Sequence, residues 1–208
     1  MIIAVDGPTA SGKGTIAKGL AERFGLKRLD TGALYRAVGL AVLDAGGDPG
    51  DEAAAVAAAR ALDLGAIDED RIRSSHAGLA ASKVAQMPAV RAVLRETQRA
   101  FAADPQGAVL DGRDIGTVIC PDADVKLFVT ASLEERTKRR HAELLARGET
   151  ITFAELQAQI AERDRRDTER KDSPLVQAAD AHLLDTTELD ASRAVAAAVA
   201  IVEAARGG

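Results

Sequence analysis

The stretch from Ile2 to Thr15, IIAVDGPTASGKGT, decides the fold. Its apolar residues Ile2 to Val5 read as a short buried strand, the glycine-rich part reads as a loop, and Lys13 begins a helix-like segment. Gly7 and Gly12 would let backbone amides close around phosphate oxygens, while Lys13 adds positive charge and the helix adds its positive N-terminal end. This order of strand, loop and helix predicts a phosphate cradle for a nucleoside triphosphate rather than an ordinary glycine-rich turn.

The loop departs at one position from the most common phosphate-loop pattern. It fulfils G-x-x-x-x-G-K, but Gly14 follows the lysine, and the hydroxyl that can ligate Mg²⁺ comes one residue later, at Thr15. The order Gly-Lys-Gly-Thr resembles the nucleoside monophosphate kinases more than the switch GTPases. We expect ATP and Mg²⁺ to bind here. The residues expected to contact the nucleotide are Gly7, Pro8, Thr9, Ala10, Ser11, Gly12, Lys13, Gly14 and Thr15.

Length and composition narrow the class of protein. With 208 residues, 47% of them hydrophobic, the chain can bury one substantial core, so we expect a single domain. Aromatic residues make up only 2% and the formal net charge is -5, which argues against a nucleic-acid partner. The apolar runs Ile2 to Val5 and Ala194 to Val202 are too short for a secretory signal or a membrane span. We expect a cytoplasmic monomer that does not bind membranes.

Cysteine and histidine show no metal-binding pattern. Cys120 is the only cysteine, which excludes an intramolecular disulfide and a thiolate metal cluster. His76, His141 and His182 are far apart in the sequence and share no ligand spacing. A histidine metal site is therefore not expected.

Short apolar runs alternate with longer helical segments along the chain, which is typical of an α/β fold with a parallel sheet covered on both faces. From Lys13 to Phe24 apolar residues recur at intervals of four, and Asp190 could cap a final helix that ends before Gly207. The expected strands are Ile2 to Val5, a short one near Leu29, Ala108 to Leu110, Val125 to Val129, and Leu183 to Leu184.

Two stretches interrupt this alternation. The first, at about 44–101, contains an alanine-rich helix and a second helix opened by Pro88, whose apolar side does not include Arg91. The second, at about 134–171, carries ten Lys or Arg and nine Asp or Glu, so positive charge is placed selectively there in an acidic chain. We expect a core at about 1–43, 102–133 and 172–208, with 44–101 and 134–171 as additions to it.

A second motif, Asp111-Gly112-Arg113-Asp114, directly follows the expected strand at 108–110. Ligands gather at the carboxyl ends of strands in an open parallel sheet, so this turn should face the same crevice as the phosphate loop. Asp111 can hold Mg²⁺ or its water, Arg113 can bind a phosphate with two donors, and Asp114 can accept a hydrogen bond from a base or sugar. The alternative is a surface turn with an internal Asp–Arg pair.

A third motif is the charged run from Glu162 to Arg170. Helical periodicity places Arg163, Arg166, Asp167 and Arg170 on one face and Arg165 on the other. In isolation such a run favours a solvated helix with pairs such as Glu162 and Arg166. Phosphoryl transfer, however, requires several converging cations to neutralise the charge that spreads over the transferred group. The run therefore predicts a lid that closes over phosphates.

The stretch from Leu29 to Arg36 is a weaker signal. It places the Thr31 hydroxyl and the Arg36 guanidinium five residues apart after a short strand. Spacing alone favours the simpler interpretation, in which Thr31 is an ordinary helix cap and Arg36 is an exposed helical charge.

These motifs together resemble the bacterial cytidylate kinase family over nearly the whole chain. They are the loop at 7–15, the stretch at 30–36, the turn that continues from Asp111 to Val118, and the run at 162–167. The resemblance implies a doubly wound core of five parallel strands, a monophosphate-binding insertion at 44–101 and a short lid at 134–171. ATP would donate a phosphoryl group to CMP or dCMP. Two departures are Thr31, where the family often has serine, and a shortening near 67–75, where family members form a small antiparallel sheet.

The resemblance also implies roles for individual residues. Ser82, Arg91 and Asp114 would read the cytosine; Thr31, Arg163 and Asp167 would hold the sugar; Arg36, Arg113 and Arg170 would bind phosphates. The residues implied in catalysis are Lys13, Arg113, Arg163 and Arg170, and those implied near Mg²⁺ are Thr15 and, through water, Asp111. Another small-molecule kinase on the same core and a nucleotide-dependent switch remain as alternative functions, although a switch has no use for the arginine-rich face.

Overall fold

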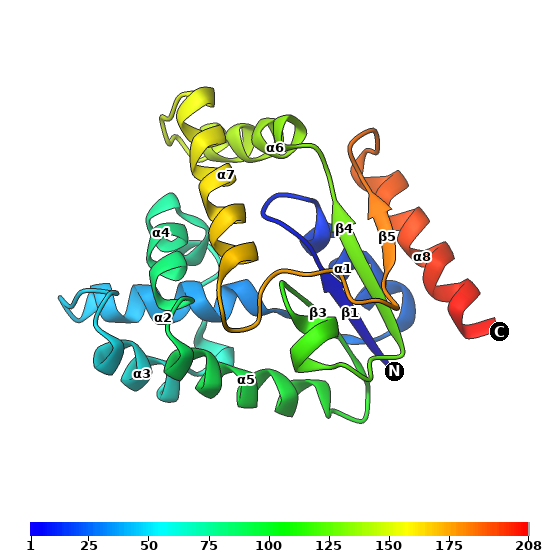
Figure 1. Ribbon diagram of the computed structural model, residues 1–208, viewed down its shortest axis with the longest axis horizontal. Coiled ribbons are helices and arrows are strands. Elements are labelled where there is room, and N and C mark those ends of the chain that lie inside the picture. The colour runs from blue at the N-terminus through cyan, green and yellow to red at the C-terminus, as the bar shows by residue number, and fades with distance from the viewer. Residues whose placement is uncertain (208) are drawn as a thin grey trace. The chain divides into compact units, whose positions relative to one another are not determined.

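The computed structural model describes residues 1–207, with side chains to residue 206. Its central sheet has five strands in the order β2-β3-β1-β4-β5 (Figure 1). β1 pairs in parallel with β3 and with β4, and β4 pairs in parallel with β5. The strands are β1 (Ile2–Asp6), β2 (Lys27–Asp30), β3 (Ala108–Gly112), β4 (Val125–Thr130) and β5 (His182–Asp185). All five lie where the sequence predicted strands, so the α/β class is confirmed.

Eight α-helices and three shorter helical segments complete the described chain. The helices are α1 (Lys13–Phe24), α2 (Thr31–Asp44), α3 (Glu52–Arg60), α4 (Ser75–Val84), α5 (Pro88–Ala102), α6 (Leu133–Ala146), α7 (Phe153–Glu169) and α8 (Ala191–Gly207). The short segments are the 3-10 turns η1 (Leu64–Ala66) and η2 (Arg71–Arg73) and the π-helix η3 (Ile115–Ile119). The Asp190 carboxylate accepts a hydrogen bond from the Arg193 amide at the start of α8, as the sequence predicted.

The chain forms two compact units, of which the first comprises Met1–Leu29 and the chain from Phe101 onward. Its core lies between the sheet and the helices α1 and α8, which pack against each other. On the other face of the sheet, η3 packs against β1, and Ile115 at its start is fully buried. The core side chains are almost entirely alanine, valine, leucine and isoleucine, as the low aromatic content requires. Both faces of β1 are thus covered, which explains its unbroken apolar sequence.

Helices α6 and α7 also belong to this first unit and pack against each other around a small core of their own. Leu144 of α6 packs with Leu156 and Ile160 of α7. A capping box between Thr152 and Glu155 begins α7, which fixes where the second helix starts after the connecting turn.

The second compact unit, Asp30–Ala100, begins earlier than the expected insertion at 44–101. Helix α2, which we assigned to the core, packs closely against α4 in this unit. A Cβ atom on Gly39 would lie 2.7 Å from the Ala80 Cβ, so the two helices touch because neither position carries a larger side chain. Near 67–75, where the family resemblance implied a shortened antiparallel sheet, the chain forms the two 3-10 turns.

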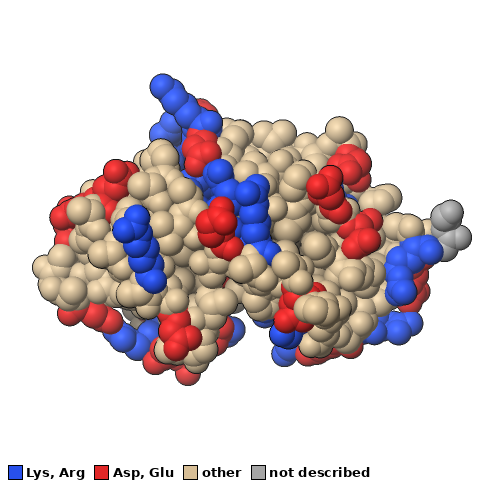
Figure 2. All heavy atoms as spheres, turned by 90° about the horizontal axis from the view of Figure 1, so that it is seen from below, with Lys and Arg blue, Asp and Glu red and all other residues tan. Residues whose placement is uncertain are grey.

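Figure 2 shows Lys and Arg side chains interspersed with Asp and Glu over the face that it presents. This mixture of the two signs is consistent with the net charge of -5. None of the described helices is long and apolar enough to cross a membrane.

Two glycines inside helices test the packing directly. A Cβ on Gly19 of α1 would lie 2.5 Å from the Val195 Cγ1 of α8, whereas a Cβ on Gly78 of α4 would meet nothing within 4 Å. We expect Gly19→Ala to lower the free energy of unfolding by roughly 1–3 kcal/mol through overpacking. Gly78→Ala should raise it by up to about 1 kcal/mol through helix propensity. Urea unfolding of both variants measures this difference, and a stabilised Gly19→Ala would contradict the packing of α1 on α8.

Candidate functional site

The loop between β1 and α1 has the backbone conformation of a phosphate cradle. Gly7 (φ 152°), Ala10 (φ 60°) and Gly12 (φ 90°) all have positive φ angles. At Gly7 a Cβ would lie 2.0 Å from the Val129 carbonyl oxygen, so no larger residue fits there. Gly12 occupies the N-cap of α1 and supplies no capping side chain, which leaves the first amides of the helix available to an anion. The two glycines singled out in the sequence are therefore required by the backbone.

Two side chains of this loop, those of Ser11 and Lys13, are placed where they could bind a ligand. Ser11 is fully buried, and its hydroxyl oxygen has no hydrogen-bond partner in the described chain. Lys13 is also buried, and its ammonium group donates to the Pro8 carbonyl oxygen at 3.0 Å. A buried hydroxyl without a hydrogen-bond partner and a lysine that lies over the loop fit a phosphate ligand, whose oxygens would accept from both groups.

The turn after β3 lies beside this loop because of the strand register. Val5 is paired with Asp111, and Asp6 with Gly112, so the phosphate loop and the Asp111–Asp114 turn leave neighbouring strands at the same level. The Asp6 carboxylate accepts hydrogen bonds from the Ile115 and Gly116 amides, each at 2.8 Å. Asp6 thereby fixes the chain that follows Asp114.

Asp6 was not singled out in the sequence, although it carries one signal: an acidic residue that ends a buried apolar strand. Burial raises its pKa from 3.8 to about 6, and the charge of Asp114 adds to the rise, while the two amides and Lys13 act in the opposite direction. The carboxylate is ionised above that pH and neutral below it.

Asp111 fits a role near Mg²⁺. Its carboxylate is buried, and a Cβ on Gly14 would lie 3.9 Å from its Oδ2, so Asp111 faces the beginning of α1, where Thr15 is found. Arg28 approaches the other oxygen of this carboxylate at 3.4 Å. The described residues contain no group of three or more acidic or histidine ligands. Carboxylate oxygens are ligands that Mg²⁺ accepts while it keeps several of its waters, so the Asp111 carboxylate fits this ion.

Two arginines converge on the phosphate loop at Thr9. The Arg113 guanidinium donates to the Thr9 hydroxyl at 2.7 Å and to the Asp167 carboxylate of α7 at 2.8 Å. Arg136 of α6 donates to the Thr9 carbonyl at 3.2 Å and to Asp164 of α7 at 2.6 Å. The sequence did not predict this pair of Arg136 and Asp164, because two residues 28 positions apart on two helices leave no periodic signal.

A third arginine joins the same cluster. Arg170 lies 3.6 Å from Asp114 and 3.9 Å from Asp167, and it donates to the Ser173 carbonyl at 2.6 Å. Burial disfavours the charged form of Asp167, but Arg113, Arg163 and Arg170 outweigh this effect and hold its pKa below the usual value. The structure therefore brings together five of the expected site residues: Arg113, Asp114, Arg163, Asp167 and Arg170.

The charged run forms a helix with two different sides, as the sequence predicted. Arg165 is exposed and pairs with Glu162 and Glu169 away from the cluster. The expected pair of a solvated helix is present as well, since Arg166 lies 3.3 Å from Glu162. One detail differs: α7 ends at Glu169, and Arg170 has an extended backbone (ψ 141°). Arg170 therefore enters the cluster from the turn after the helix rather than from its face.

The remaining expected site residues belong to the second unit. Thr31 is buried in the first turn of α2, but the cap of that helix is Asp30, which accepts from the Ala33 amide at 3.1 Å. The alternative that Thr31 is the helix cap is therefore wrong. The Asp30 carboxylate also binds Arg36 at 2.6 Å, so Arg36 is held beside the start of α2 rather than being an unpaired surface charge.

Arg91 is nearly fully buried, at 3% exposure, although the apolar pattern of α5 placed it off the buried side. Its guanidinium lies 5.7 Å from the centre of the Tyr35 ring, which compensates part of the cost of burying the charge. Ser82 lies half-buried on α4. That Thr31, Arg36, Ser82 and Arg91 act together with the cluster of the first unit stays a prediction.

The pKa of Asp6 gives a testable pH dependence. Between pH 3.8 and about 6 the folded protein keeps a proton on Asp6 that the unfolded chain has lost. The contribution of Asp6 to the free energy of unfolding is therefore present below this window and is lost as the pH rises through it. Asp6→Asn does not titrate and serves as the reference. We expect the stability of the natural protein relative to this variant to fall by about 3 kcal/mol across the window, measured by urea unfolding. A difference that grows with pH would contradict the buried environment of Asp6.

Comparisons with known proteins agree with this geometry. The family model for cytidylate kinase matches residues 3–204. The cytidylate kinase of Xanthobacter autotrophicus is 59% identical over 208 residues, and that of Azorhizobium caulinodans is 58% identical over 207 residues, each match covering 100% of both chains. Among solved structures, an uncharacterized protein from Eubacterium ventriosum shares the fold, with a TM-score of 0.58, 15% identity and 98% of each chain covered. The chain therefore belongs to the cytidylate kinase family, as its motifs predicted.

Proposed function

We propose that this protein transfers the γ-phosphoryl group of ATP to CMP or dCMP, giving ADP and CDP or dCDP. The observation that carries the proposal is the arginine cluster in which Arg113 and Arg136 bind Thr9 of the phosphate loop and Arg170 shares the Asp167 carboxylate with Arg113. Each of these guanidiniums forms an ion pair with a carboxylate of the protein. Phosphoryl transfer needs positioned cations far more than a protein nucleophile, and this cluster supplies them at the edge of the donor loop.

The donor side of the reaction uses the phosphate loop. The amides of the loop and of the first turn of α1 would surround the β- and γ-phosphates, and Lys13 would exchange its bond to the Pro8 carbonyl for a phosphate oxygen. Thr15 and, through water, Asp111 would hold Mg²⁺, which would supply positive charge that neutralises part of the phosphate charge. Arg113 would give up part of its pairing with Asp167 to bind the transferred group.

On the acceptor side, the base would be read by Asp114, Ser82 and Arg91. Cytosine presents an amino donor at N4 beside acceptors at N3 and O2, so a carboxylate or hydroxyl accepts from N4 while an arginine donates to the acceptors. Uracil reverses two of these positions and leaves buried acceptors unpaired, at about 1–3 kcal/mol each. Thr31, Arg163 and Asp167 would hold the sugar, and Arg36, Arg113 and Arg170 the phosphates. We expect the enzyme to act as a monomer in the cytoplasm.

Turnover with individual acceptors tests this function. Purified protein with Mg·ATP is mixed with each nucleoside monophosphate in turn, and ADP formation is followed. We expect rapid turnover with CMP and dCMP and much slower turnover with UMP, AMP and GMP. Turnover with a different acceptor would identify another kinase on the same fold, whereas ATP binding without turnover on any acceptor would favour a nucleotide-dependent switch.

The two sides of α7 provide a matched pair of variants. Arg170→Ala removes a cation from the cluster at Asp114 and Asp167, so kcat should fall by roughly 10²-fold or more. Arg165→Ala removes an exposed arginine that pairs only within its own helix, and kcat should stay within about two-fold. Steady-state kinetics with saturating ATP and CMP measure both. Equal losses in the two variants would favour the solvated-helix interpretation.

Base selectivity depends on Asp114. If its carboxylate accepts from the cytosine amino group, Asp114→Asn presents an amide NH₂ that can donate to the O4 of uracil. The ratio of kcat/KM for CMP over that for UMP should then fall by roughly 10-fold, and activity with CMP should fall as well. A proportional loss with both substrates would instead assign Asp114 to the support of Arg170, which lies 3.6 Å away.

A further inference from the structure

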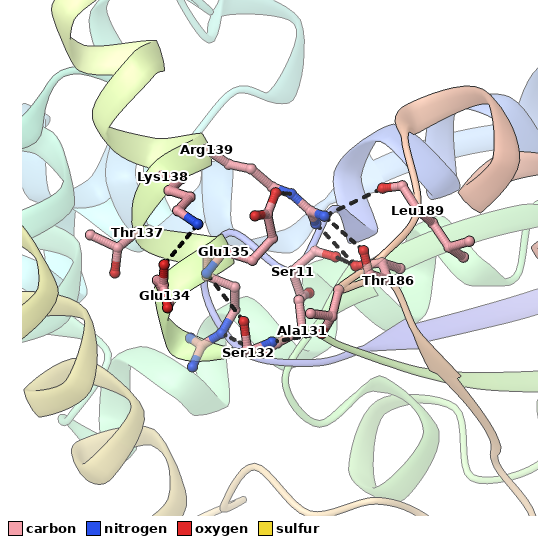
Figure 3. Close-up of polar contacts among 12 residues, drawn as sticks. Ser11, Ala131, Ser132, Glu134, Glu135, Thr137, Lys138, Arg139, Thr186 and Leu189 are labelled. Atoms are coloured by element: carbon pink, nitrogen blue, oxygen red, sulfur yellow. Dashed lines mark hydrogen bonds and ion pairs between the residues drawn. The ribbon is translucent and has the colours of Figure 1, made fainter.

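We propose that Arg139 is a positioning residue for the donor site, which holds the phosphate loop through a hydrogen-bonded relay from α6 over Thr186 to Ser11. This inference deepens the proposed function, because it concerns how the ATP loop keeps its shape. Figure 3 shows the Arg139 side chain reaching from α6 toward Thr186 and Leu189, away from its neighbour Lys138.

The guanidinium of Arg139 is bound on two edges. Its Nη1 donates to the Thr186 hydroxyl at 3.0 Å, and its Nη2 donates to the Thr186 carbonyl at 2.7 Å and to the Leu189 carbonyl at 3.4 Å. Its Nε donates to Glu135, one helical turn earlier, at 3.1 Å. Glu135 balances the positive charge, so the distinctive contribution of Arg139 is the fixed geometry of its donors.

Thr186 passes this constraint on to the phosphate loop. The residue is almost fully buried, and its hydroxyl lies 2.9 Å from the Ser11 carbonyl and 3.1 Å from the Thr130 carbonyl. A hydroxyl has one proton to donate, and the Thr130 carbonyl already accepts from the Thr186 amide at 2.8 Å. The hydroxyl accepts from Arg139 and can donate its proton to the Ser11 carbonyl, the nearer of the two carbonyls, which links Arg139 to the loop.

The relay ends at the part of the loop that faces the donor phosphates. A Cβ on Gly12 would lie 3.6 Å from the Arg139 Nη1 and 4.0 Å from the Thr186 hydroxyl oxygen, so both groups line the outer side of this glycine. Lys13 follows directly. A shift of the Ser11 carbonyl would turn the peptide planes that aim the loop amides at phosphate, and misplacement by about 1 Å is enough to impair catalysis.

A second arginine of the same helix holds the other half of the loop. Arg136, three residues before Arg139, donates to the Thr9 carbonyl at 3.2 Å. The two arginines therefore hold Thr9 and Ser11 from one helix, with Arg136 bound directly and Arg139 through Thr186. The first turns of α6 act as a clamp on the loop.

The test uses four variants and a neighbouring control. Arg139→Met removes the donors while keeping the stem, Arg139→Lys keeps the charge without the fork, and Thr186→Val removes only the relay hydroxyl. The double variant Arg139→Met/Thr186→Val completes a cycle. Lys138→Met is the control, because Lys138 is exposed and its ion pair is with Glu134 of the same helix. Binding of ATP without acceptor is measured by calorimetry, the KM values for ATP and CMP by kinetics, and stability by urea unfolding.

We expect Arg139→Met and Thr186→Val each to weaken ATP binding by roughly 10-fold, because each variant removes one buried hydrogen bond. The KM for CMP should stay within about two-fold of the natural value. Arg139→Lys should restore less than half of this loss on a logarithmic scale, and the double variant should be no weaker than Arg139→Met alone. Lys138→Met should bind ATP as the natural protein does. Unchanged ATP binding in Arg139→Met, equal losses for ATP and CMP, or additive effects in the double variant would each overturn the relay.

The ATP-binding readout separates this inference from the proposed function. If the natural protein bound ATP but did not phosphorylate CMP, the proposed reaction would fail while the relay could still be judged from the calorimetric data. If CMP were phosphorylated and Arg139→Met bound ATP normally, only the relay would fail.

Discussion

The parallel pairing of β1 with β3 is the constraint on which the rest of the site depends. It places the end of β1, where the phosphate loop begins, level with the end of β3, where the Asp111–Asp114 turn begins. Asp6 strengthens this arrangement, because its carboxylate at the end of β1 binds two amides of the chain after that turn. A shift of register by one residue would move the arginine and aspartate of the turn away from the loop and turn their side chains to the opposite face.

Ion pairs hold the arginine side chains that lie near the phosphate loop. Three arginines near the phosphate loop are paired with Asp114, Asp164 and Asp167 rather than with solvent. Partly buried cations that lie this close to one another would repel, so the carboxylates are needed to balance their charge. Incoming phosphates must compete with these carboxylates. The carboxylates thus position the arginines, and the reaction uses the same cations only when phosphates offer a stronger partner.

The sequence was sufficient to predict the helices and strands named here and the local motifs. Periodicity and glycine placement predict all five strands, the bounds of α1 and the two different sides of α7. The sequence was insufficient to predict features that depend on tertiary contacts. The burial of Arg91 depends on a ring contributed by another helix, and the pairing of Arg136 with Asp164 depends on how α6 and α7 pack. The boundary of the second unit likewise follows from the close packing of α2 on α4, which no local pattern encodes.

The clamp at the beginning of α6 limits how the predicted lid at 134–171 can move. Arg136 and Arg139 tie the first two turns of α6 to the phosphate loop and to the start of the segment after β5. Those turns therefore belong mechanically to the core, and any closing motion must bend the chain beyond Arg139. Further along, α6 and α7 are joined by their own small apolar core around Leu144, so the two helices would move as one body. Closure would then move Asp164 and Asp167 together relative to Arg136 and Arg113, which stay with the core, so both ion pairs would change in a single step.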